Sequence, residues 1–110
     1  MVNIIIISLI LFFVAALFEI GGGYMIWRWL KYKKDLFIGL FGGLALFSYG
    51  VIQTLQQANF GRTYAAYGGI FIFSSIIWGA IVDKKTPDRY EIIGALITLV
   101  GALIIFFAPR

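Results

Sequence analysis

Long runs of apolar residues dominate the chain, and short polar segments separate them. The first run covers residues 2–27 and contains one charged residue, whereas the runs at 36–55, 63–82 and 92–108 contain none. About 20 apolar residues cross a bilayer core as a helix, and a helix satisfies its own backbone hydrogen bonds in lipid. The pattern predicts an all-α membrane protein: one domain, residues 1–110, with four transmembrane helices at about 2–30, 35–56, 63–82 and 90–108.

Composition supports the membrane class and removes several functions. Hydrophobic residues make up 62% of the chain and charged residues 13%, against about 25% charged residues in soluble domains. The chain has no cysteine and no histidine, so we expect no metal and no cofactor. We also expect no enzyme, because none of the runs contains a nucleophile–base pair. The first run is longer than the apolar part of a signal peptide and has no basic start, which favours a retained helix.

The basic residues predict an orientation. Seven of the nine fall in two of the polar segments, and two fall on the opposite side: Arg28, Lys31, Lys33, Lys34, Lys84, Lys85 and Arg89, against Arg62 and Arg110. Lys and Arg accumulate on the cytoplasmic side of a membrane. We therefore expect a multi-pass protein of the inner (cytoplasmic) membrane with both termini away from the cytoplasm. Basic residues confined to short loops indicate lipid headgroups as a partner, and no nucleic acid.

Glu19 is the one charged residue inside an apolar run. A charge near the bilayer centre costs about 2.5–3.5 kcal/mol on insertion scales, and Arg28 lies roughly 13 Å away along a helix, too far to pair. We predict that Glu19 binds protons or cations. Small residues one turn to either side would let another helix or a ligand approach it: Ala15, Ala16, Gly22 and Gly23. The alternative is a neutral Glu19 that hydrogen-bonds a neighbour within tight helix packing.

The third run carries aromatic residues at helical spacing: Tyr64, Tyr67, Phe71 and Trp78. Such a stripe is often simple packing, but aromatic faces attract organic cations, and tyrosine hydroxyls in lipid need partners. With a carboxylate nearby, the stripe is predicted to form one wall of a cation site. The pair Gly68 and Gly69 would permit a kink or hinge.

The fourth run contains a face of small residues. Gly94 and Gly101 are one heptad apart, with Thr98 between them. Small residues allow helices in a membrane to approach closely. This face is predicted to be a helix-association surface and a dimer contact.

Three segments together resemble a known family. "GRTYAAYGGI" at residues 61–70, "FEI" in the first helix and "GALITLVGALII" in the fourth resemble the YnfA family of small bacterial membrane proteins, within the EmrE-like small multidrug resistance superfamily. The resemblance implies a four-helix protomer that works as a dimer, often antiparallel. It implies that Glu19 binds protons and substrate in turn, that Tyr64 and Tyr67 form an aromatic pair, and that Gly94 and Gly101 contact the second protomer.

The chain departs from superfamily patterns at three positions. Gly22 stands where exporters of guanidinium-type ions carry tryptophan one turn after the glutamate. Leu44 stands where multidrug members have a tyrosine, and Tyr67 where they have a tryptophan.

The resulting hypothesis is a transporter that exports small organic cations in exchange for protons. Its site would be shared around Glu19 at the interface of a homodimer, with an antiparallel dimer favoured and a heterodimer as the other arrangement. The alternative is a partner subunit of a heteromeric membrane complex without its own exchange, or a flippase for lipid-linked substrates. The uneven distribution of basic residues favours the alternative, because an antiparallel homodimer needs both orientations.

Overall fold

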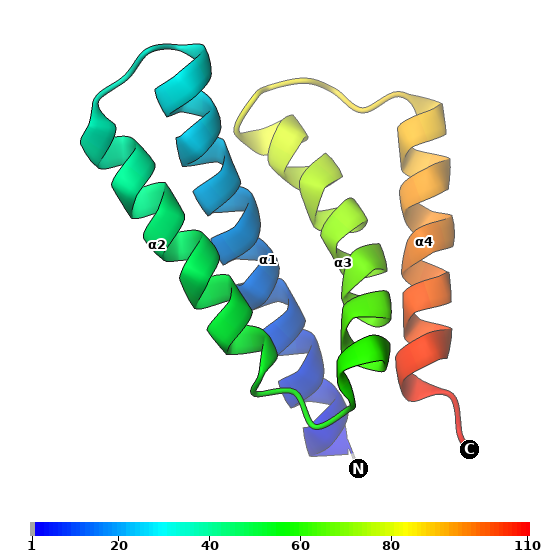
Figure 1. Ribbon diagram of the computed structural model, residues 1–110. Coiled ribbons are helices and arrows are strands. Elements are labelled where there is room, and N and C mark those ends of the chain that lie inside the picture. The colour runs from blue at the N-terminus through cyan, green and yellow to red at the C-terminus, as the bar shows by residue number, and fades with distance from the viewer. Residues whose placement is uncertain (1) are drawn as a thin grey trace.

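The computed structural model describes residues 2–110, and within them it has four α-helices (Figure 1). They are α1 (Val2–Lys31), α2 (Leu36–Gln53), α3 (Phe60–Ile81) and α4 (Arg89–Phe107). All four are long and apolar enough to cross a membrane, which confirms the predicted fold class. Two boundaries differ from the prediction by three residues, and the others agree to within one: α2 ends at Gln53 rather than at 56, and α3 begins at Phe60 rather than at 63.

Polar caps explain where the helices after α1 begin. Asp35 accepts a hydrogen bond from the backbone N–H of Phe37 before α2, and Asn59 accepts one from Arg62 at 2.8 Å before α3. Asp88 and Glu91 form a reciprocal capping box at the start of α4. Because the first backbone N–H groups of a helix have no partner within the helix, these side chains satisfy them.

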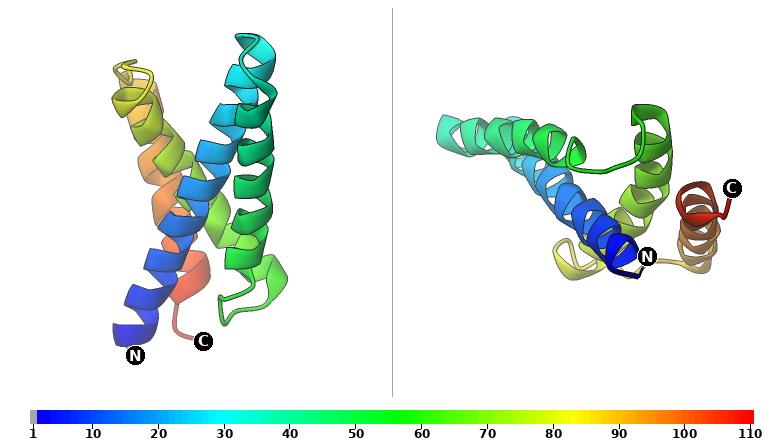
Figure 2. Two further views of the ribbon diagram at one scale, coloured as in Figure 1. Left: turned by 90° about the vertical axis from the view of Figure 1, so that its left-hand side faces the viewer. Right: turned by 90° about the horizontal axis from the view of Figure 1, so that it is seen from below.

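The helices form two antiparallel hairpins, α1–α2 and α3–α4 (Figure 1). The hairpins meet where α1 crosses α3, and Figure 2 shows them splaying apart toward the α1–α2 and α3–α4 loops. We call that end of the bundle the loop face. The opposite end is the termini face, which carries the α2–α3 loop and both ends of the described chain.

The seam between the hairpins is a small core of buried residues. Phe12, Ala15 and Ala16 of α1 pack in one cluster with residues of α3 and α4, and each is at most 1% exposed; the others are Ala66, Tyr67, Ile70 and Ala102. The small alanines allow α1 to lie close against α3. This seam fixes how the middle of α1 faces α3.

Within each hairpin, glycine allows the two helices to touch backbone to backbone. A Cβ atom added to Gly22 in α1 would lie 2.7 Å from the carbonyl oxygen of Gly42 in α2. A Cβ added to Gly69 in α3 would lie 2.5 Å from the carbonyl oxygen of Thr98 and 2.6 Å from the Cβ of Ala102 in α4. Both distances are shorter than any normal contact of a Cβ atom. Each hairpin therefore packs tightly through a glycine.

We predict that Gly69→Ala lowers the thermal stability of the protein, whereas the neighbouring Gly68→Ala does not. Alanine in a helix is favoured over glycine by about 0.5–1 kcal/mol, but overpacking costs about 1–3 kcal/mol, and a Cβ on Gly68 meets nothing within 4 Å. Thermal unfolding in detergent, followed by circular dichroism, measures the difference. Equal midpoints for the two variants would contradict the close approach of α3 to α4.

Candidate functional site

Glu19 lies in the middle of α1, on the side that faces α3. The hydroxyl of Tyr67 donates a hydrogen bond of 2.7 Å to Oε1 of Glu19. Tyr67 is 4% exposed and belongs to the buried seam, while Glu19 is half-buried. A hydroxyl that donates to a carboxylate supplies part of the interaction that water would otherwise give.

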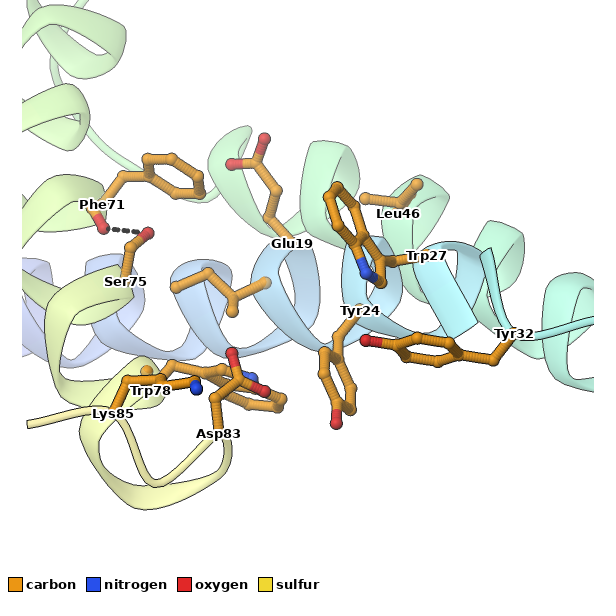
Figure 3. Close-up of a pocket in the computed structure, with 13 residues that line it drawn as sticks. Glu19, Tyr24, Trp27, Tyr32, Leu46, Phe71, Ser75, Trp78, Asp83 and Lys85 are labelled. Atoms are coloured by element: carbon orange, nitrogen blue, oxygen red, sulfur yellow. Dashed lines mark hydrogen bonds between the residues drawn. The ribbon is translucent and has the colours of Figure 1, made fainter. Parts of the chain in front are cut away.

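A cavity of about 850 Å³ begins at Glu19 and extends toward the loop face. Its volume is within the usual range for small-molecule sites, about 300–1,000 Å³. Figure 3 shows its lining side chains, which come from α1, α2, α3 and the loops beyond α1 and α3. The aromatic residues among them are Tyr24, Trp27, Tyr32, Phe71 and Trp78. The cavity thus has an aromatic wall with a carboxylate at one end.

The other charged side chains of this cavity lie near its mouth. Asp83 and Lys85 follow α3 at the loop face and line the cavity together with Tyr32. Glu19 is the one charged residue that lines its deeper part. Aromatic faces attract cations more strongly when water is excluded. The deep end of the cavity therefore suits a positively charged group.

Two aromatic side chains from different hairpins meet across this cavity. The rings of Tyr24 in α1 and Trp78 in α3 lie edge to face, with centroids 5.6 Å apart. Within the described residues, Nε1 of Trp78 is buried and has no hydrogen-bond partner. An unpaired indole N–H is unusual in a buried position, and here it is a donor available beside the cavity.

Comparison with known proteins identifies the family. The family described as "Uncharacterised BCR, YnfA/UPF0060 family" matches residues 5–110. The chain belongs to the YnfA/UPF0060 family. This confirms the resemblance to the YnfA family that the three sequence segments indicated.

Curated relatives of this family are similar along nearly their whole length. A UPF0060 membrane protein of Desulfitobacterium hafniense (strain Y51) is 53% identical over 104 residues, which cover 94% of this chain and 96% of the relative. A UPF0060 membrane protein of Halalkalibacterium halodurans is 56% identical over 101 residues, 91% and 94% of the two chains. UPF0060 membrane protein YfjF of Bacillus subtilis (strain 168) is 51% identical over 105 residues, 94% and 96%. No solved structure matches the chain.

The structure brings together part of the predicted site of this YnfA-family protein. Gly23, Phe71 and Trp78 line the same cavity as Glu19, and Tyr67 reaches Glu19 by its hydroxyl. Tyr64 does not line this cavity. It packs beside Tyr67, with ring centroids 6.5 Å apart, and faces a second cavity at the termini face.

Three small residues predicted to line the site lie elsewhere. Ala15 and Ala16 are buried in the seam between the hairpins, and Gly22 packs against Gly42 of α2. Residues three and four positions from Glu19 spread over a wide arc of the helix. Some of that arc therefore faces α2 and α3 rather than the cavity.

The predicted hinge and dimer residues have distinct surroundings. The helix α3 continues without a break through Gly68 and Gly69. A Cβ atom added to Gly94 or Gly101 of α4 would meet nothing within 4 Å, whereas the backbone of Thr98 contacts Gly69. The small-residue face of α4 is thus divided, with one part turned toward α3 and another left open.

Sequence reasoning missed several residues that line the cavity. Ser75 had a usable signal, because positions 71, 75 and 78 follow the helical spacing of one face. Tyr24, Trp27 and Tyr32 had a weaker signal, since aromatic residues near a membrane interface are common. Asp83 and Lys85 had none, because their position depends on how the loop after α3 folds back beside α1.

We predict that the cavity can be reached by water-soluble reagents at the position of Ser75. The chain has no native cysteine, so single cysteines report cleanly. Ser75→Cys should react with a small thiol reagent at least ten times faster than Ala66→Cys, which replaces a residue 1% exposed in the seam of the same helix. Mass spectrometry of labelled protein in liposomes measures both rates. Equal rates would contradict an accessible cavity.

Proposed function

We propose that this YnfA-family membrane protein exports small organic cations across the bacterial cytoplasmic membrane in exchange for protons. The observation that carries the proposal is the position of Glu19. It lies at mid-helix in α1, holds the Tyr67 hydroxyl, and forms the deep end of an aromatic cavity of about 850 Å³. Ionisable residues inside the membrane are most often functional.

The exchange follows from competition for one carboxylate. An ionised Glu19 attracts a cation, and the aromatic wall adds to that attraction. A proton that binds Glu19 removes its charge and releases the cation. Because both ligands need the same oxygen atoms, each side of the membrane can exchange one for the other. The tyrosine hydroxyl keeps the carboxylate turned toward α3 in either form.

The size and lining of the cavity favour organic cations over bare metal ions. Within residues 2–110, no group of three or more His, Cys, Asp or Glu is placed to hold a metal ion. A volume of about 850 Å³ with tryptophan and phenylalanine in its wall suits a cation that carries apolar groups.

A dimer would complete the site. The two hairpins of one protomer splay apart toward the loop face (Figure 2), which leaves the cavity open at its side. A second protomer would close it and add a second Glu19. The open positions Gly94 and Gly101 of α4 support a contact between protomers there. We propose an antiparallel homodimer, with a heterodimer of two related chains as the second arrangement.

One observation favours a second candidate function. The seven basic residues at the loop face, against two at the termini face, favour a single orientation in the membrane. A chain held in one orientation suits a partner subunit in a heteromeric complex, including one that moves lipid-linked substrates. Such a subunit would not exchange protons for cations on its own.

We predict that Glu19→Gln abolishes proton flux driven by a cation gradient and leaves assembly intact. Glutamine keeps the size of the side chain but cannot bind and release a proton, and it removes the cost of a charge in the membrane. Proteoliposomes with an internal pH-sensitive dye and a panel of quaternary and guanidinium cations measure the flux.

The matched control is Glu91→Gln. It makes the same chemical change in the capping box of α4, and glutamine can also form such a box. Its flux should equal that of the wild type. Wild-type flux in Glu19→Gln would refute the mechanism. If the wild-type protein carries no proton flux with any cation, either alone or in liposomes that also contain a related chain, the second candidate function, a partner subunit, is favoured.

We predict that Gly94→Val together with Gly101→Val weakens the dimer at least tenfold without unfolding the protomer. A Cβ atom added at either position meets nothing within 4 Å in the protomer, so we expect added bulk there to act mainly on a neighbouring chain. Gly43→Val is the control, because that position of α2 is equally open. Cross-linking in detergent over a dilution series measures association. An unchanged dimer would show that α4 does not form the interface.

A further inference from the structure

A second cavity lies at the termini face, on the other side of Glu19 from the aromatic one. It has a volume of about 250 Å³ and lies between the end of α2 and the start of α3. Five of its eight lining residues have polar side chains, although most of the lining surface is apolar: Gln53, Thr54, Gln56, Thr63 and Tyr64. None of the functions derived above uses these glutamines.

Two buried amides at this cavity have polar atoms without a hydrogen-bond partner. Gln53 is 4% exposed, and among the described residues neither its Oε1 nor its Nε2 has a hydrogen-bond partner. Gln56 is 8% exposed; its Nε2 donates to the carbonyl oxygen of Ser8 at 2.9 Å, while its Oε1 is unpaired. A buried polar group without a partner costs about 1–3 kcal/mol. Gln53 is the last residue of α2, and Gln56 follows in the α2–α3 loop. Two such side chains close to the end of a membrane helix indicate an environment that contains water.

The volume of the cavity is large enough for that water. A water molecule occupies about 30 Å³ in the liquid, and a polar site with several partners holds water readily. Glutamine, threonine and tyrosine side chains offer both donors and acceptors to it. The cavity can therefore hold water beside these polar groups, and water conducts protons.

Three tyrosines separate this cavity from Glu19. Tyr64 lines the cavity, and Tyr67 holds Glu19 through its hydroxyl. Tyr49 of α2 packs against both, with ring centroids 6.4 Å from Tyr64 and 5.4 Å from Tyr67. The three rings form a layer from α2 and α3, which we call the tyrosine layer. On its far side lies the aromatic cavity that opens toward the loop face.

We propose that the cavity around Gln53 is a hydrated vestibule for protons and cations at the termini face, and that Tyr49 closes it from Glu19. The inference rests on the proposed function, for which Glu19 must meet each side of the membrane in turn. In the structure, the three rings of the tyrosine layer pack together, and Glu19 lines the cavity that opens toward the loop face. Displacement of Tyr49 with the α1–α2 hairpin would join Glu19 to the vestibule. Tyr49 acts here as a gate and does not itself bind substrate.

The test is passive proton leak in proteoliposomes without any cation substrate. Tyr49→Ala removes the ring and should raise the leak at least tenfold over wild type after an external pH jump, because Glu19 then meets both cavities at once. The double variant Tyr49→Ala, Glu19→Gln should return to the wild-type leak. Tyr49→Phe keeps the ring and should not leak.

Tyr90→Ala is the matched control. It removes an exposed tyrosine at the start of α4, away from both cavities, and should leave the leak unchanged. A folded Tyr49→Ala protein with wild-type leak would overturn the gate, and so would a leak that persists without Glu19. The leak assay needs no cation, so it is independent of the cation-flux assay. If the wild-type protein shows no cation-driven flux, the exporter proposal is overturned. A leak in Tyr49→Ala would still support the gate.

A second measurement tests the vestibule if Tyr49→Ala fails to fold. Gln53→Cys removes an unpaired buried amide, so the fold should tolerate it. In a hydrated vestibule, this cysteine should react with a small hydrophilic thiol reagent at least ten times faster than Ala66→Cys in the dry seam, although both native residues are under 5% exposed. Equal, slow rates would overturn the proposal.

Discussion

The central constraint on this protein is the carboxylate of Glu19 within an apolar bundle. A carboxylate in the membrane must be neutral, paired or in contact with water, and no Lys, Arg or His lies in the four apolar runs to pair with it. The structure meets the constraint with a hydroxyl and a cavity. Tyr67 donates to one oxygen, and the aromatic cavity leaves Glu19 half-buried rather than enclosed. The half-buried carboxylate and the open cavity therefore come from the same physical requirement.

The packing around this carboxylate is uneven in a way that suits movement. Each hairpin is held by a backbone contact through glycine, Gly22 on Gly42 and Gly69 on Thr98, where no side chain can intervene. The seam between the hairpins is smaller and built from a few side chains around Ala15 and Ala16. Close-packed units tend to move as rigid bodies. The α1–α2 hairpin can therefore shift against α3, and the aromatic cavity and the tyrosine layer both lie along that boundary.

The fold could be predicted from sequence because the bilayer sets the length of an apolar run. Glu19 could be singled out as a candidate site residue because a charge in such a run is rare. Which side of each helix packs against another helix, and which side faces lipid, could not be predicted. Lipid is as apolar as a protein core, so the outward and inward sides of these helices differ little in composition. Neighbouring glycines illustrate the limit: Gly22 contacts α2 while Gly23 lines the cavity, and Gly69 contacts α4 while Gly68 is open. The contacts of Tyr49 with Tyr64 and Tyr67 could not be predicted for the same reason.

The basic residues at the loop face act on both the orientation and the site. The same loops that carry the charge bias also place Lys85 and Asp83 at the mouth of the aromatic cavity. A protomer inserted by this bias has its cavity open toward the cytoplasm and its vestibule on the other side. For the proposed antiparallel dimer, the minor orientation must be selected by assembly, and a tenfold bias in orientation corresponds to only about 1.4 kcal/mol. An interhelical polar contact in a membrane contributes about 0.6–2 kcal/mol, so a few contacts between protomers are enough to offset such a bias. In the proposed dimer, charge would set which side the first protomer faces, and helix packing would decide what joins it.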